Sequence, residues 1–142
     1  MSTPLSLAAR QARLLALRDL LDVGGGELWF YTLPDPLTIP ATPETTTTET
    51  LLGTIALAGP SGAIGASGQV ATLTLTVPRV NPTVATGLIG FVRLVDGAGD
   101  SHLDLLVGES GVTYDPPRPV LVSDLQVYAG GELQLISCVI SE

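Results

Sequence analysis

The chain contains a single histidine, His102, so any catalytic arrangement that needs an imidazole must be built around it. In a Ser/His/Asp arrangement, Asp100 or Asp104 would orient the ring and a serine would be the nucleophile. Residues two apart on a strand share a face, which places His102 beside Asp104. The sequence lacks the Gly-x-Ser-x-Gly elbow of many serine hydrolases. We therefore expect a surface polar pair and no enzymatic activity, with a small hydrolase built on His102 as the alternative.

Two further features could carry chemistry: a pair of aspartates that could bind a metal ion, and a cysteine that could react. Asp96 and Asp100 enclose two glycines, as acidic residues do in calcium loops, but the third ligand and the closing glutamate are missing. We expect a hairpin loop there, and the alternative is a calcium site shared with another loop or subunit. The single cysteine, Cys138, has apolar neighbours, which predicts a buried and inert thiol. Neither a disulfide nor a zinc site can be assembled from this chain, and we expect no cofactor.

Half of the six aromatic residues lie together in Trp29-Phe30-Tyr31. On a strand, Trp29 and Tyr31 point to one face and Phe30 to the other. Packing in the core is the first interpretation of this cluster. A subunit interface is the alternative, because aromatic side chains often anchor interfaces.

One segment, near the start of the chain, has the pattern of a helix. Ser2 or Thr3 is expected to cap it and Pro4 suits its first turn. Arg10 and Arg13 lie opposite its apolar face, and the glycines at 24–26 are expected to end it. Leucines at helical spacing form the apolar face, which Leu20 and several alanines widen: Leu7, Leu14, Leu17 and Leu21.

The rest of the chain has the pattern of a β protein. In Val70–Val77, apolar residues alternate strictly with threonines and Val70, which is typical of an antiparallel strand with one face in the core. We expect a single domain, made of a helix and glycine turn at 1–26 and an antiparallel β-sandwich or jelly roll of about eight strands at 27–142. The predicted strands are Glu27–Leu33, Leu51–Leu57, Val70–Val77, Gly87–Val95, His102–Val107, Pro119–Val122, Asp124–Tyr128 and Glu132–Ile140.

Glycine-rich and threonine-rich segments separate these strands. Asp96–Asp100 is expected to join two strands as a hairpin, and Ala129–Gly131 to join the last two. Thr42–Thr50 is low in complexity and expected to be extended or mobile. Gly59–Gly68 has glycine at every third position, and we expect a flexible loop because so few triplets cannot form a collagen helix.

Composition excludes several classes of partner. Charged residues make up 14% of the chain, all six basic residues are arginine, and the net charge is −8. A chain without a basic stripe is not expected to bind nucleic acid or an acidic membrane surface. The N-terminus has no signal-peptide pattern, and the uncharged stretch between Glu49 and Arg79 is too broken by glycine to span a membrane. We expect a soluble protein made in a reducing compartment.

The order of these motifs resembles a family of small tailed-bacteriophage proteins that are encoded among virion structural genes. The resemblance extends over nearly the whole chain and consists of signals typical of a fold, with no catalytic signature. The chain departs from the family at Ile89-Gly90 and Val92, and again in the proline-rich segment 115–119. The segments that resemble the family are 27–32 (Glu-Leu-Trp-Phe-Tyr-Thr), 51–57, 85–99, 103–108 and 127–133.

The resemblance implies a non-enzymatic virion structural protein, assembled in the host cytoplasm. A capsid cement (decoration) protein that bridges capsid subunits is the first hypothesis, since a mean hydropathy of +0.44 favours permanent association. Its partners would be copies of itself and the major capsid protein. The alternatives are a tail or fibre-associated protein and a β-sandwich module that binds a host glycan. The expected interface residues lie on the helix and the aromatic strand: Arg10, Arg13, Leu14, Leu17, Leu21, Trp29 and Tyr31.

Overall fold

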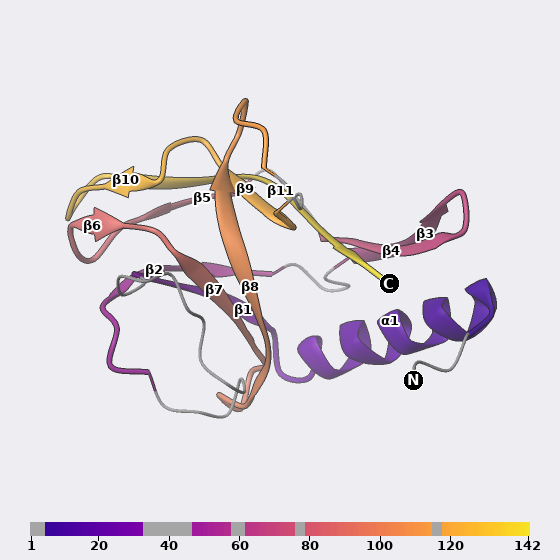
Figure 1. Cartoon of the computed structure of the whole chain (residues 1–142). Coiled ribbons are helices and arrows are strands. Elements are labelled where there is room, and N and C mark those ends of the chain that lie inside the picture. The colour runs from indigo at the N-terminus through magenta and orange to yellow at the C-terminus, as the bar shows by residue number, and fades with distance from the viewer. Residues whose placement is uncertain (1–4, 33–46, 58–61, 76–78, 115–117) are drawn as a thin grey trace.

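A computed structural model of the chain describes residues 5–32, 47–57, 62–75, 79–114 and 118–142. In these parts the protein is mainly β, with one helix, α1 (Leu7–Leu21), and a curled sheet (Figure 1). The strands in chain order are β1 (Glu27–Tyr31), β2 (Leu51–Ala56), β3 (Gly62–Ser67), β4 (Val70–Leu75), β5 (Arg79–Pro82), β6 (Gly87–Leu88), β7 (Phe91–Val95), β8 (Ser101–Glu109), β9 (Val120–Val122), β10 (Gln126–Val127) and β11 (Glu132–Ser141).

The N-cap of α1 is Ser6, whose Oγ accepts a hydrogen bond of 3.1 Å from the backbone N–H of Ala9. The helix thus begins later than the prediction of a Ser2 or Thr3 cap, and both of those residues lie outside the described part. It ends as predicted at the glycine run, where Gly24 has a φ of +71°. The apolar face is narrower than predicted, because Leu20 is 49% exposed.

Each of the eight predicted segments contains a strand of the structure. The alternation in Val70–Val77 is confirmed in the described residues, since Ala71, Leu73 and Leu75 are buried while Val70 is exposed. The segment Gly87–Val95 is divided into β6 and β7. The division falls where the chain changes neighbours, because the N–H of Ile89 bonds to Leu125 O and the N–H of Gly90 bonds to Tyr31 O.

Two strands, β3 and β5, were not predicted. The prediction of a loop at Gly59–Gly68 is wrong for residues 62–67, which form β3 and pair with β4 along their whole length. Gly68 and Gln69 form the two-residue hairpin loop, and Gly68 has the positive φ of +60° that such a turn requires. The strand was missed because its side chains are nearly all small, so no alternation of apolar and polar residues marks it.

The strands of the main sheet lie in the order β2-β1-β7-β8-β9-β11-β4-β3, and β5 pairs with the first part of β11 on the edge opposite β9, the edge that β4 pairs with farther along. All pairs are antiparallel except β8 and β9, which run parallel, so the sheet is mixed and not purely antiparallel as predicted. The hairpin at Asp96–Asp100 is confirmed between β7 and β8. The segment Ala129–Gly131 connects β10 to β11, but β10 pairs with β6 in a separate two-stranded ribbon.

One cluster of buried residues holds the curled sheet and the helix together. Leu28 and Phe30 of β1 belong to it, as do Leu133 and Leu135 of β11 from the other half of the sheet. The helix contributes Leu14 and Leu21 and packs mainly over β4 and β3. No helix in the described residues has the length and hydropathy needed to cross a membrane.

Candidate functional site

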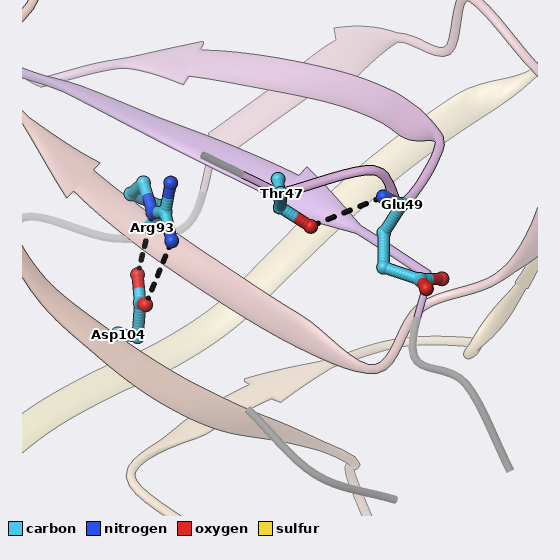
Figure 2. Close-up of polar contacts among 4 residues, drawn as sticks. All are labelled: Thr47, Glu49, Arg93 and Asp104. Atoms are coloured by element: carbon cyan, nitrogen blue, oxygen red, sulfur yellow. Dashed lines mark hydrogen bonds and ion pairs between the residues drawn. The ribbon is translucent and has the colours of Figure 1, made fainter. Parts of the chain in front are cut away.

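A buried ion pair lies on the face of β7 and β8 opposite the core. The strand register aligns Trp29 with Arg93 and Arg93 with Asp104. Arg93 Nε and Nη2 donate to the two carboxylate oxygens of Asp104 at 2.8 and 3.0 Å, and only 6% and 3% of these side chains are exposed (Figure 2). This two-pronged contact fixes the register of β7 and β8 and neutralises Asp104. Asp104 is therefore already engaged and does not orient His102.

Aromatic side chains cover the same face beside the ion pair. The rings of Tyr31 and Phe91 stack with centroids 5.2 Å apart, and the Arg93 guanidinium lies 5.9 Å from the Phe91 ring. Burial raises the pKa of the Tyr31 phenol. Trp29 is half-buried, and its indole Nε1 is covered without a hydrogen-bond partner among the described residues. The aromatic cluster thus packs within this chain, with Trp29 its most accessible ring.

The described end of the threonine-rich segment is tied to the end of β1. Thr32 Oγ1 donates to Glu49 Oε2 at 2.8 Å and accepts from the N–H of Thr50 at 3.1 Å. The N–H of Glu49 also donates to Thr47 Oγ1 at 3.1 Å, a local turn that Figure 2 shows. The earlier part of the predicted loop, Thr42–Thr46, lies outside the described residues. These hydrogen bonds fix the residues just before β2 to the end of β1.

His102 contacts Asp96, and not Asp100 or Asp104 as expected. Its Nε2 lies 2.9 Å from Asp96 Oδ2 across the β7–β8 hairpin. Asp96 Oδ1 accepts from the N–H groups of Ala98 and Asp100 at 2.9 and 3.1 Å. The hydrogen bond from His102 is the main cause that lowers the pKa of Asp96. Both oxygens of Asp96 therefore stabilise the hairpin loop.

The hairpin loop does not gather further acidic ligands. In the residues that the structure describes, no three His, Cys, Asp or Glu side chains are close enough together to hold a metal ion. The loop instead contacts the end of the helix, because the N–H of Gly97 donates to Val23 O at 2.8 Å. This arrangement supports the interpretation of a structural hairpin.

Cys138 is confirmed as a buried thiol. Its side chain is fully covered in the core, opposite Val120 of β9. Burial raises the pKa of this thiol to about 12, so almost no thiolate forms at neutral pH. The thiol is therefore a packing group, and it is chemically inert while the chain is folded.

The predicted interface residues of the helix are largely engaged within the chain. Leu14 and Leu21 are 4% and 0% exposed, and Leu17 packs against the same core, so their side chains offer little surface to a partner. Arg13 Nη1 lies 2.7 Å from Glu142 Oε1, and Arg10 Nη1 donates to the backbone oxygen of Glu142 at 3.4 Å. The two arginines thus hold the end of β11 against the helix. Of the expected set, Arg13 is exposed, and Arg10, Leu17 and Trp29 are half-buried.

Large apolar side chains are exposed elsewhere, at positions that the sequence analysis did not select. At the β6–β10 ribbon, Val84, Leu88 and Tyr128 are 68%, 60% and 65% exposed, and we call these three residues the ribbon patch. Leu88 lies opposite Gln126, and Tyr128 follows two residues later, so Leu88 and Tyr128 share one face of the ribbon. On the helix, Leu15 and Leu20 are exposed beside the buried stripe, and Leu5 and Val23 are exposed just before and just after the helix. Exposure of an apolar residue depends on the tertiary fold, which is why sequence periodicity did not find these residues.

A shallow hollow of about 490 Å³ lies over β9 and β11. Its lining includes the apolar residues Leu105, Leu121 and Val139 and the cationic Arg118. The guanidinium of Arg118 is already held, because it donates to Val107 O at 2.7 Å and lies 4.3 Å from the Tyr114 ring. The hollow therefore offers apolar contact and no free charged group.

Comparison with protein-family models, with curated proteins and with solved structures finds no match to this chain. The phage family thus stays a prediction from the resemblance of the sequence.

Proposed function

We propose that the chain is a non-enzymatic structural protein of a bacteriophage virion, most specifically a capsid cement protein that bridges capsid subunits and associates with copies of itself. In this proposal the curled sheet is the body of a jelly-roll-like cement protein. The resemblance of the sequence to small virion proteins is the starting point. The structure contributes the surfaces through which such a protein would act.

The observation that carries the proposal is the presence of exposed apolar side chains in two separate places. The ribbon patch lies at the β6–β10 end of the molecule, and the other set lies along α1 toward the opposite end (Figure 1). Exposed apolar clusters of this kind mark protein interfaces. A molecule with two such surfaces is suited to bridging two neighbours.

The side chains whose types could take part in catalysis support the same structural role. His102 is held by Asp96, Asp104 is neutralised by Arg93, and Cys138 is buried in the core. Each of these groups stabilises a hairpin, a strand pair or the core. The fold uses its reactive residue types for stability, as expected of a protein whose role is mechanical.

The location is tested on purified particles of the phage that encodes the chain. Mass spectrometry and electron cryomicroscopy should find the protein on the capsid surface at a copy number that follows capsid symmetry. Density on the tail at low copy number would replace the cement role by a tail role. Absence from the particles would overturn the virion proposal altogether.

The ribbon patch is tested by adding purified protein back to particles that lack it. The double variant Leu88→Ser with Tyr128→Ser should bind at least about tenfold more weakly, because central apolar contacts dominate interface energies. Val112→Ser is the matched control, since Val112 is 48% exposed and lies outside the ribbon. Equal binding of the double variant and the control would show that the ribbon patch is not the capsid contact.

A further inference from the structure

The strand β3 is the last strand of the sheet, and on its outer side no described residue pairs with it as a strand (Figure 1). Its hairpin loop has two residues, so Ser67 and Val70 form the hydrogen-bonded pair that closes the turn. Hydrogen bonding alternates along an antiparallel strand, and the N–H and C=O groups of Gly62, Ile64 and Ala66 therefore point away from β4. The Gly62 oxygen already accepts a long hydrogen bond from Arg18 Nη1 at 3.4 Å, but a carbonyl oxygen can accept a second one, so these groups form an edge that can pair with another strand.

The helix runs alongside this edge. Gln11 Nε2 donates to Gly65 O at 2.9 Å, and Arg18 Nη1 donates to Gly62 O at 3.4 Å. Seven helix residues rise about 10.5 Å and three strand residues about 10 Å, so these contacts align α1 with β3 in opposite chain directions. Leu15 lies between Gln11 and Arg18 along the helix, on the flank that faces past β3, and is 38% exposed.

We propose that two copies of the chain associate through their β3 edges in an antiparallel pair about a twofold axis. With the axis at Ile64, this residue pairs with its own copy, and Gly62 of each protomer pairs with Ala66 of the other. The two main sheets become one continuous sheet. The two α1 helices then lie side by side on the same face of it, and each Leu15 contacts the Leu15 of the other protomer.

The second copy is the occupant that the charge distribution favours. The chain has a net charge of −8, yet no charged residue occurs between Glu49 and Arg79, the stretch that contains β3. Two copies can therefore bring their β3 strands together without a carboxylate on either strand, and the acidic side chain next to Arg18 on the helix, Asp19, lies 3.4 Å from Arg18 Nη2 and is paired with it. The flank of α1 beside the edge presents Gln11, Leu15 and Arg18, and none of these is acidic. The inference gives a surface to the self-association in the proposed function, and to that extent rests on it.

The first experiment removes a hydrogen-bond donor from the edge. Ala66→Pro deletes an outward N–H, whereas the matched control Ala66→Ser keeps it. Light scattering after size exclusion should give twice the chain mass for the unaltered protein and for Ala66→Ser. Ala66→Pro should be a monomer with an unchanged circular dichroism spectrum. A monomeric unaltered protein at concentrations of about 0.1 mM, or a dimer that Ala66→Pro leaves intact, would overturn the proposal.

The second experiment does not depend on how β3 tolerates proline. Under mild oxidation, Leu15→Cys should form a covalent dimer, since the axis brings this position close to its own copy. Leu20→Cys, on the opposite flank of the same helix, should remain monomeric, and Cys138 is too buried to interfere. Equal cross-linking of both variants would overturn the proposed arrangement. A dimer that is absent from virions would contradict the virion role and leave this inference standing. A virion protein that is monomeric would contradict this inference and the self-association in the proposed function, but not the virion role.

Discussion

The two edges of the main sheet differ in how far other residues of the chain cover them. At the β2 edge, the N–H of Val84 donates to Leu52 O at 2.9 Å, and Leu52 and Ile55 are buried. At the β3 edge, Ala63, Ala66 and Ser67 are exposed, and the bonds from Gln11 and Arg18 reach only two carbonyl groups. Soluble β proteins usually block exposed edges against association. A chain that covers the β2 edge and leaves the β3 edge accessible is suited to associate through β3.

The ion pairs near the two edges also differ in exposure. Arg93 and Asp104 lie in the half of the sheet that ends in β2, and they are almost fully buried. Arg13 and Glu142 lie between the helix and β11, beside the β4–β3 hairpin, and 62% of the Arg13 side chain is exposed. The ion pair of the β2 half is thus shielded from water, whereas the ion pair beside the β4–β3 hairpin is screened by it.

The largest effect is expected from breaking the buried ion pair. Asp104→Ala removes the carboxylate that accepts two hydrogen bonds from the buried Arg93 guanidinium and should lower the free energy of unfolding by about 3–5 kcal/mol. Urea denaturation measures this change. The double variant Asp104→Leu with Arg93→Met should recover much of the loss, because no charge is left buried. A loss below about 1 kcal/mol for Asp104→Ala would mean that the pair does not hold this half together.

A matched pair of leucine substitutions compares the stability cost of truncating a buried leucine of the β2 edge with that of truncating a partly exposed leucine of the helix. Leu52 is fully buried, and Leu52→Ala should cost about 2–5 kcal/mol through lost contacts and the cavity left behind. Leu20→Ala removes the same atoms from a side chain that is 49% exposed, and should change stability by less than about 0.5 kcal/mol. Thermal unfolding of both variants gives the comparison. Similar costs at the two positions would contradict the full burial of Leu52 at the β2 edge.

The β7–β8 hairpin should make stability depend on pH. Because the pKa of Asp96 is lowered from its ordinary value of 3.8, the folded chain binds fewer protons there than the unfolded chain. The resulting stability is complete above pH 3.8 and is lost as the pH falls through the lower folded value. Asp96→Asn should therefore lower the Tm at pH 7 and flatten its decline toward pH 2. Asp19→Asn, which removes the same charge from the helix, should keep the decline of the unaltered protein, and an equally steep decline in Asp96→Asn would refute the role of Asp96.

The smallest effect is expected from the exposed ion pair. Arg13→Ala should change the free energy of unfolding by less than about 0.5 kcal/mol, because water and salt screen the contact with Glu142. A double-mutant cycle with Glu142→Gln isolates the coupling energy. A coupling above about 2 kcal/mol would show that the helix is fastened by charge and not by its leucines.

The sequence was informative where side-chain polarity alternates or where glycine marks a turn. All eight predicted segments contain strands, and the buried positions Ala71, Leu73 and Leu75 were predicted from alternation alone. The strand β3 gave no such signal, because alanine and glycine suit a loop as well as a strand. The pair Gly68-Gln69 is a turn signal, and it indicates a two-residue loop that would join a strand ending at Ser67 to the strand that begins at Val70.

Pairing partners were harder to predict than elements. The distance of two residues between His102 and Asp104 suggested a contact, yet Asp104 faces Arg93 across the strands and His102 reaches Asp96 over the hairpin loop. The parallel pair of β8 and β9 likewise depends on the path of the chain between them. Such choices are made by tertiary packing, which a single sequence does not encode locally.

Hydrogen exchange at two protein concentrations tests the open edge most directly. We expect the amides of Ile64 and Ala66 to exchange rapidly in dilute solution and to become protected as the concentration rises. The amides of Leu52 and Ile55 in β2 should show the same protection at both concentrations. Exchange at Ile64 and Ala66 that does not change with concentration would contradict the claim that β3 is the edge through which the protein assembles.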